Sequence, residues 1–239
     1  MQSGAKKIPN NLIFFWHDKK SLPDQIRRAV DNTVAASQGA RIVFADDGYM
    51  YDFIESHYDN DTLAQYKRIR VPASRSDVAR LMLLYEFGGL YLDAAMETLT
   101  AAHSIVDDDA DLLFVRRDDL SRYAKRPDQA HVINGIVGAA GRCDLIKEAI
   151  EMVLDNLRTC RYDNVWYATG AHSLNVLLER HGHRYRIEIL RFSELSGKFF
   201  VYRRVPGVSN AWVVQQRYGI LSPPASNSEG HSVPSSPQE

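Results

Sequence analysis

Short apolar runs alternate with amphipathic stretches along the first half of the chain. Residues 11–16 ("NLIFFW") and 40–47 ("ARIVFADD") are apolar runs with the length of a buried strand. Between them, residues 21–37 place apolar side chains at helical spacing, and another helix begins within "MYDFIESHY", residues 50–58. Because strands that alternate with helices form sheets covered by those helices, this order predicts an α/β fold with a mostly parallel central sheet.

The most regular helical pattern covers residues 76–87, "SDVARLMLLYEF". Ser76 is predicted to cap its start, and Gly88 and Gly89 are predicted to end it. The "LYLD" that follows is predicted to be a strand ending at Asp93. Open α/β sheets bind their ligands at the carboxyl ends of strands, so Asp93 is expected at a ligand-binding edge.

The second half continues the alternation, with predicted strands at 111–117, 131–141 and 185–190 and helices at 142–158 and 170–182. From Ser222 onward the chain is rich in Ser and Pro and has almost nothing to bury. We therefore expect one domain over residues 1–221, followed by a flexible tail or lid over 222–239.

Charge and composition narrow the classes of partner. The formal net charge of the 239 residues is -1, which gives no general attraction to nucleic acid or to anionic membranes. The apolar run "LIFFW" is too short for a signal segment or a membrane span. These features predict a cytoplasmic protein without a nucleic-acid partner or a transmembrane segment, either free or peripheral at the inner face of a membrane.

A few polar residues could carry chemistry, and each has a structural alternative. Asp77 and Arg80 lie three residues apart on one helix face, which is the spacing of an ordinary surface ion pair. Their helix leads directly to the strand that ends at Asp93, so the pair could instead belong to a ligand site. Asp93 itself could cap a turn or bind a ligand. Trp16 could be core or could stack on a nucleobase. No phosphate-binding loop, dinucleotide fingerprint or nucleophile elbow is present in the sequence.

Several segments together resemble a known enzyme family. The matching segments are "IPNNLIFFWHDKKSLPDQI", "FADDGYMYDFI", "INGIVGA", "TGAHSL" and, most specifically, "SDVARLMLLYEFGGLYLD". They are similar to glycosyltransferases with a DXD sugar-binding region, which include initiating α-1,6-mannosyltransferases, capsular polysaccharide transferases and, distantly, clostridial glucosylating toxins. The resemblance implies a GT-A type nucleotide-diphospho-sugar transferase fold and a role in polysaccharide biosynthesis.

The resemblance also implies roles for individual residues. Trp16 would stack on the base, Asp77 and Arg80 would contact the donor sugar and the phosphates, and Asn134 would face the sugar or the acceptor. Tyr91, Asp93 and Trp212 would complete the donor pocket. A Mn²⁺ or Mg²⁺ ion would be held by Asp93, as the first DXD aspartate, together with Ser209 and Asn210.

The second DXD aspartate is replaced by Ala95 in this chain. A methyl group cannot coordinate hard cations, so metal binding is expected to be weakened or absent. Glu97 could replace the missing ligand only because residues 93, 95 and 97 of an extended chain point to the same face. Three explanations stay open: an alanine introduced to inactivate the enzyme, a native transferase that relies on Arg80 and other cations, or a degenerate binding protein.

The predicted function is that of a retaining glycosyltransferase. It would move a hexose from a UDP- or GDP-sugar to a saccharide, glycolipid or protein acceptor, with activity weakened or lost through Ala95. The alternative is a catalytically silent sugar-nucleotide-binding protein of the same fold. A third hypothesis is an interaction module that recruits partners through the Ser/Pro-rich tail.

Overall fold

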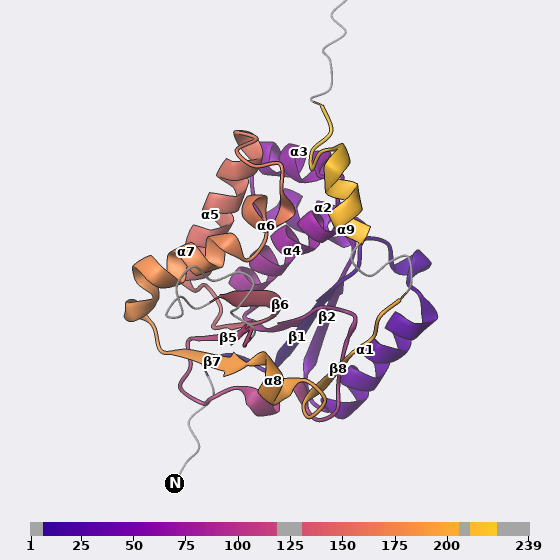
Figure 1. The fold of residues 1–239 in the computed structure, drawn as a ribbon, viewed down its shortest axis with the longest axis vertical. Coiled ribbons are helices and arrows are strands. Elements are labelled where there is room, and N and C mark those ends of the chain that lie inside the picture. The colour runs from indigo at the N-terminus through magenta and orange to yellow at the C-terminus, as the bar shows by residue number, and fades with distance from the viewer. Residues whose placement is uncertain (1–6, 119–130, 206–210, 224–239) are drawn as a thin grey trace, which may run out of the picture.

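The computed structural model describes residues 7–118, 131–205 and 211–223. Its centre is a six-stranded sheet with the strand order β2-β1-β3-β6-β5-β7 (Figure 1). The strands are β1 (Asn11–Phe15), β2 (Arg41–Ala45), β3 (Gly89–Leu92), β5 (Leu112–Arg116), β6 (Val132–Ala139) and β7 (Ile187–Arg191).

Most of the sheet is parallel, as the alternation of strands and helices predicts. β1 runs parallel to both β2 and β3, and β5 runs parallel to β7. β6 is the exception, because it lies between β3 and β5 and runs antiparallel to both. The mixed α/β fold with a mostly parallel sheet is therefore confirmed, with one reversed strand.

Helices cover one face of the sheet. They are α2 (Asp47–His57), α3 (Asn60–Arg68), α4 (Pro72–Phe87), α5 (Asp144–Arg158) and α7 (His172–His181). On the other face lie α1 (Asp24–Ala36) and the two-stranded sheet of β4 (Met96–Thr98) and β8 (Phe200–Tyr202). Short helices α6 (Val165–Ala168), α8 (Phe192–Leu195) and α9 (Ala211–Gln215) complete the described fold. Short 3-10 turns occur at Lys19–Ser21, Ala102–Ile105, Gly182–Arg184 and Gln216–Tyr218.

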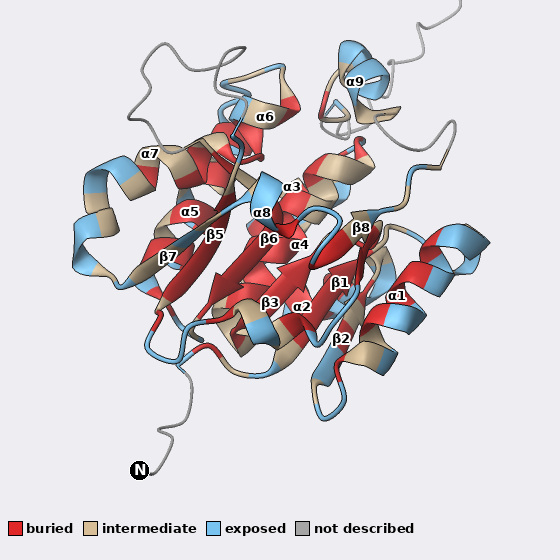
Figure 2. Ribbon diagram, turned by 60° about the horizontal axis from the view of Figure 1, so that its bottom comes forward, coloured by how far each residue is buried: buried red, intermediate tan, exposed pale blue. Residues whose placement is uncertain are grey.

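The alternation of side chains along β1 explains how one strand serves both layers. Ile13 and Phe15 pack into the core under α4, whereas Leu12 and Phe14 pack into the core under α1. All four side chains are buried, and buried residues fill the central strands in Figure 2. An apolar run with no polar position is what a strand covered on both faces requires.

Helix α4 begins one turn earlier than the sequence predicts. Pro72 occupies its first turn, where the missing N–H costs nothing, and Ser76 lies inside the helix rather than at its cap. The predicted end is confirmed, because Gly88 has a φ of 60° and Gly89 a φ of 116°. A Cβ atom on Gly89 would lie 2.5 Å from the carbonyl oxygen of Asn11, so only glycine lets β3 enter beside β1.

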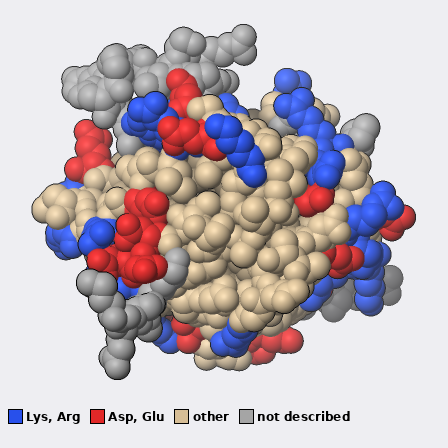
Figure 3. Space-filling view, turned by 90° about the horizontal axis from the view of Figure 1, so that it is seen from below, with Lys and Arg blue, Asp and Glu red and all other residues tan. Residues whose placement is uncertain are grey.

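Within the described residues, no helix is long and apolar enough to cross a membrane. On the face drawn in Figure 3, acidic and basic side chains are intermingled toward the edges and the centre is uncharged. The predicted tail falls mostly on residues 224–239, which lie outside the described residues.

Candidate active site

Helix α4 and strand β3 bring four of the predicted site residues together. Asp77 and Arg80 lie on α4, Tyr91 lies on β3, and Asp93 follows the last residue of that strand. All four line a cleft of about 1640 Å³. The surface-pair interpretation of Asp77 and Arg80 is wrong, because their side chains are only 8% and 4% exposed.

Asp77 accepts hydrogen bonds from three different side chains. Its Oδ1 atom accepts from Arg80 Nη1 at 2.7 Å and from Asn134 Nδ2 at 2.7 Å. Its Oδ2 atom accepts from Thr169 Oγ1 at 3.0 Å. Burial raises the pKa of this carboxyl above its ordinary value, although the charge and hydrogen bonds of Arg80 oppose that rise.

Arg80 joins the two carboxylates of the site. While Nη1 donates to Asp77, Nη2 donates to Asp93 Oδ1 at 3.1 Å. The guanidinium also lies over the ring of Tyr91, 4.3 Å from its centroid. Burial lowers the pKa of Arg80, but Tyr91 and the two carboxylates outweigh this and leave it raised, so the side chain stays charged.

Asp93 is fixed through its backbone as well as its side chain. Its N–H donates to the carbonyl of Gly135 at 2.8 Å, and its carbonyl accepts from Met96 N–H at 2.7 Å, which closes a tight turn. A Cβ atom on Gly135 would lie 2.9 Å from Asp93 Oδ2, so the carboxylate occupies space that only a glycine leaves open. The side chain does not cap this turn, because its Oδ1 atom accepts from Arg80 and from Tyr91 OH.

Two further residues of the cluster lack a role in the sequence-based prediction. Ser76, predicted only as a cap, shares a 2.8 Å hydrogen bond with Tyr91 OH. Thr169, which directly precedes the helix predicted at 170–182, is 2% exposed and donates to Asp77 from a position 92 residues away along the chain. The "TGAHSL" segment was the available signal for Thr169, since it belongs to the quoted resemblance.

The two predicted tryptophans lie on the walls of the cleft. Trp16 follows β1, is half-buried against the core under α1, and has a buried Nε1 atom without a hydrogen-bond partner. One side chain therefore both packs against the core and lines the cleft. Trp212 is the second residue of α9 and packs against the core under α4 while lining the same cleft. Ser209 and Asn210 lie outside the described residues.

The described residues do not fit a divalent metal site. Asp93 is the single carboxylate beside the turn, and one of its oxygens already accepts from Arg80. Ala95 lines the cleft without an oxygen to offer. Within the described part of the chain, no group of three or more His, Cys, Asp or Glu side chains could hold a metal ion.

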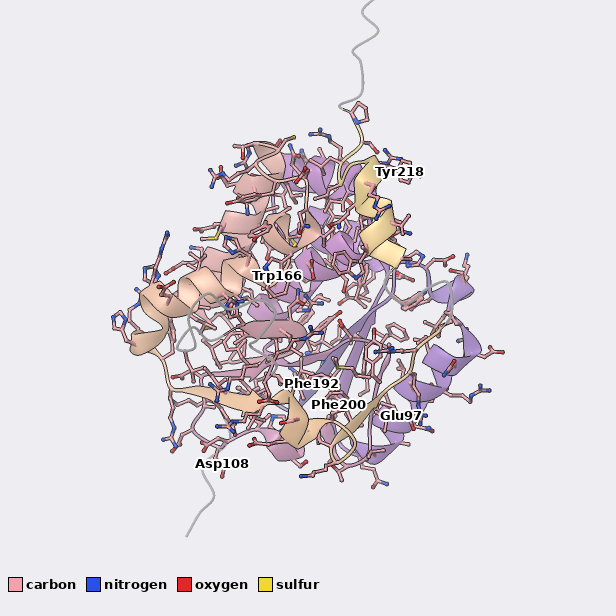
Figure 4. All side chains as sticks on the ribbon, in the orientation of Figure 1. Glu97, Asp108, Trp166, Phe192, Phe200 and Tyr218 are labelled. Carbon is pink, nitrogen blue, oxygen red and sulfur yellow. The ribbon has the colours of Figure 1, made fainter. Side chains whose placement is uncertain are left out.

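Glu97 is not a substitute ligand. Its carboxylate accepts from Asn32 of α1 at 2.9 Å and from Arg203 at 2.5 Å. It lies beside α1 in Figure 4 and is absent from the described cleft wall. The alternation argument fails because the turn closed by Asp93 and Met96 breaks the extended chain before Glu97.

Comparisons with known proteins agree with this geometry. Residues 2–111 match the family described as "Glycosyltransferase sugar-binding region containing DXD motif". The curated protein "Uncharacterized glycosyltransferase L373" of Acanthamoeba polyphaga mimivirus is 28% identical over 90 residues. That match covers 37% of this chain and 36% of the relative, so the chain spans about a third of that protein.

A solved structure shows the likeness of the whole fold. "PaToxG Glycosyltransferase" aligns with a TM-score of 0.55 and 14% identity, over 88% of this chain and 76% of that one. At this identity the likeness concerns the fold, which is the GT-A type expected from the sequence. The family match ends at residue 111 and does not include Asn134 or Thr169, whose contacts with Asp77 are seen in the structure.

Proposed function

Because residues 2–111 match the family of glycosyltransferases with a DXD sugar-binding region, we propose that this chain transfers a hexose with retention from a UDP- or GDP-sugar. The acceptor is a saccharide, a glycolipid or a protein. One observation carries the proposal: the buried pair of Asp77 and Arg80, joined to the partly exposed Asp93, lines a cleft at the end of β3. An ordinary surface ion pair stays in contact with solvent. Charged side chains that are held in place on the wall of a cleft are instead typical of sites that bind sugar hydroxyls and phosphates.

The cluster suits the charges of glycosyl transfer. As the bond between sugar C1 and the phosphate oxygen breaks, its electron pair moves to the nucleoside diphosphate and C1 becomes cation-like. The Asp77 carboxylate favours positive charge on the sugar ring, and the amide of Asn134 is held against Asp77 at 2.7 Å. Asp77 is itself held by Thr169, so its position is set before the donor arrives.

Retention is supported by the carboxylates of the cleft. Among the described residues that line it, the carboxylates are Asp77, Asp93 and Glu179. The first two are bonded to Arg80, and Glu179 lies near the end of α7. An inverting enzyme needs a general base facing the acceptor hydroxyl. In the retaining mechanism, the acceptor oxygen bonds C1 on the side that the phosphate leaves, and its proton passes to that phosphate.

Aromatic side chains support a saccharide-bearing acceptor. Tyr167 of α6 is 46% exposed, and its ring centroid lies 4.9 Å from that of His172 on α7. Trp166 on α6 and Phe192 on α8 lie apart in Figure 4, and both line the cleft, which therefore extends between these helices. Flat rings with a polar edge match the apolar faces and hydroxyl rims of sugars.

A donor panel tests the proposal. UDP-glucose, UDP-galactose, UDP-N-acetylglucosamine and GDP-mannose are compared by melting temperature and by release of the nucleoside diphosphate. We expect one of them to stabilise the protein, and Asp77→Asn to abolish that effect. Asp155→Asn, which changes an exposed carboxylate paired with Arg161, is the matched control and should behave as the parent. The proposal is wrong if none of these donors, nor UDP or GDP, stabilises the parent protein.

A further inference from the structure

The described site has too little positive charge for the leaving group of the proposed reaction. Arg80 contributes one positive charge, and Asp77 and Asp93 contribute two negative charges when ionised, which leaves the trio at 1 − 2 = −1. A departing nucleoside diphosphate adds further negative charge beside it. Ala95 provides no ligand for a metal ion that could offset this charge.

A second arginine lies next to the turn that contains Ala95. The backbone N–H of Arg203 donates to the carbonyl of Ala95 at 2.7 Å, which fixes the end of β8 against the turn. Arg203 itself is turned to Glu97, with Nε 2.5 Å from Oε2. Its neighbour Arg204 is exposed and lines the cleft. Arg204 forms no ion pair with any described carboxylate within 4.0 Å.

Tyr202 links Arg204 to the site. Its ring lines the cleft on the same segment, and its strand partner is Met96, the residue that closes the turn with Asp93. Burial raises the pKa of Tyr202, the charge of Asp93 adds to the rise, and the charge of Arg204 opposes it. The charges of both residues therefore act on this phenol, and all three residues line the same cleft.

We propose that Arg204 provides the positive charge that a metal ion provides in glycosyltransferases with two DXD aspartates, so that this chain binds a nucleoside diphosphate without metal. This inference rests on the proposed function. A guanidinium donates up to five hydrogen bonds and binds phosphate oxygens in pairs, which makes it a fitting partner for a diphosphate. The positive charge of Arg204 then compensates for the alanine at position 95, and the diphosphate site is kept.

Calorimetric titration of UDP and GDP tests the inference, with uridine and guanosine as probes that lack phosphate. Each is titrated in the presence of Mn²⁺ and in the presence of EDTA. We expect the preferred diphosphate to bind equally well in both, and Arg204→Ala to weaken its binding roughly 10- to 100-fold. Binding of the nucleoside should not change, because it lacks the group that Arg204 holds. Arg204→Lys should recover part of the loss.

Two further arginines serve as controls. Arg191 is exposed, pairs with Glu194 and does not line the cleft, so Arg191→Ala should leave binding unchanged. Arg117 is exposed and lines the cleft without the connection to the Ala95 turn, so Arg117→Ala should cost less than Arg204→Ala. An equal loss in both variants would overturn the assignment to Arg204.

The outcomes separate this inference from the proposed function. Binding of UDP or GDP only with Mn²⁺ would overturn the inference and leave the proposed function standing. Metal-free binding that Arg204→Ala leaves unchanged would overturn it as well. No binding of any nucleotide under either condition would instead remove the proposed function, and the inference with it.

Discussion

The Nη2 atom of Arg80 lies 3.1 Å from Oδ1 of Asp93, so the guanidinium that holds Asp77 also occupies an oxygen that Asp93 could offer to a cation. Arg80 therefore has two functions that are difficult to separate. It forms ion pairs with two carboxylates that line the cleft, and it sets where both of them point. The first function is one of stability, and the second concerns the donor.

Removal of Arg80 should destabilise the protein strongly. Arg80→Ala would leave the buried Asp77 without its cation, and breaking a buried ion pair in this way costs about 3–5 kcal/mol. Urea unfolding measures the loss. Arg142→Ala is the matched control, because it removes an exposed arginine that pairs with Glu86 and should cost less than about 1 kcal/mol. Equal losses in the two variants would contradict the structural role given to Arg80.

Acid should affect the stability of the protein and its donor binding in opposite directions through Asp77. The folded pKa of this carboxyl is raised above 3.8, so between 3.8 and the raised value the folded state holds a proton that the unfolded state has released. The contribution of Asp77 to stability therefore falls as the pH rises through that window. Donor binding needs the carboxylate, so it falls as the pH drops through the raised pKa.

Differences between the parent and Asp77→Asn isolate this effect from the other titrating groups. Melting temperature is measured on both proteins, and donor affinity on the parent, over the same acidic range. The parent should lose donor affinity toward low pH while its stability relative to the variant improves. If donor affinity and the stability relative to the variant fall together, the raised pKa of Asp77 is not their cause.

Local sequence patterns predicted the parts of the site that lie close together in the chain. Helix α4, the glycine pair and the strand that ends at Asp93 follow from periodicity and turn chemistry within a single segment. Thr169 contacts Asp77 across 92 residues, and Asn134 contacts it across 57. No local pattern encodes such contacts, and only the resemblance to a family pointed to the segments that make them.

The same limit explains the elements that were missed. Strand β4 is three residues long and is stabilised by pairing with β8, about a hundred residues later. The antiparallel direction of β6 also depends on its partners β3 and β5, because an apolar strand pattern does not indicate whether the strand pairs in parallel or antiparallel. Arg204 directly follows Arg203, whose backbone N–H donates to the carbonyl of Ala95, so the place of Arg204 on the cleft wall depends on that distant pairing and carries no local sequence signal.

Gly135 should prove essential to the site although it offers no side chain. A Cβ atom there would lie 2.8 Å from Met96 Cε and 2.9 Å from Asp93 Oδ2, so Gly135→Ala must displace the carboxylate or the methionine. We expect donor affinity to fall roughly tenfold, about 1.4 kcal/mol. Gly141→Ala is the control, since its Cβ would meet nothing nearer than 3.6 Å. Unchanged affinity in Gly135→Ala would show that the position of Asp93 is not critical.

An oxygen ligand at position 95 should create metal binding that the parent chain lacks. Ala95 lines the cleft within the turn closed by Asp93 and Met96, so Ala95→Asp places a second carboxylate beside Asp93. Mn²⁺ should then raise the melting temperature of the variant, since ligand at a hundred times its dissociation constant adds about 2.7 kcal/mol. Ala95→Asn has the same shape without the charge and should respond far less. An equal response of the parent, Ala95→Asn and Ala95→Asp would place the metal elsewhere and remove the reason for Arg204 to replace it.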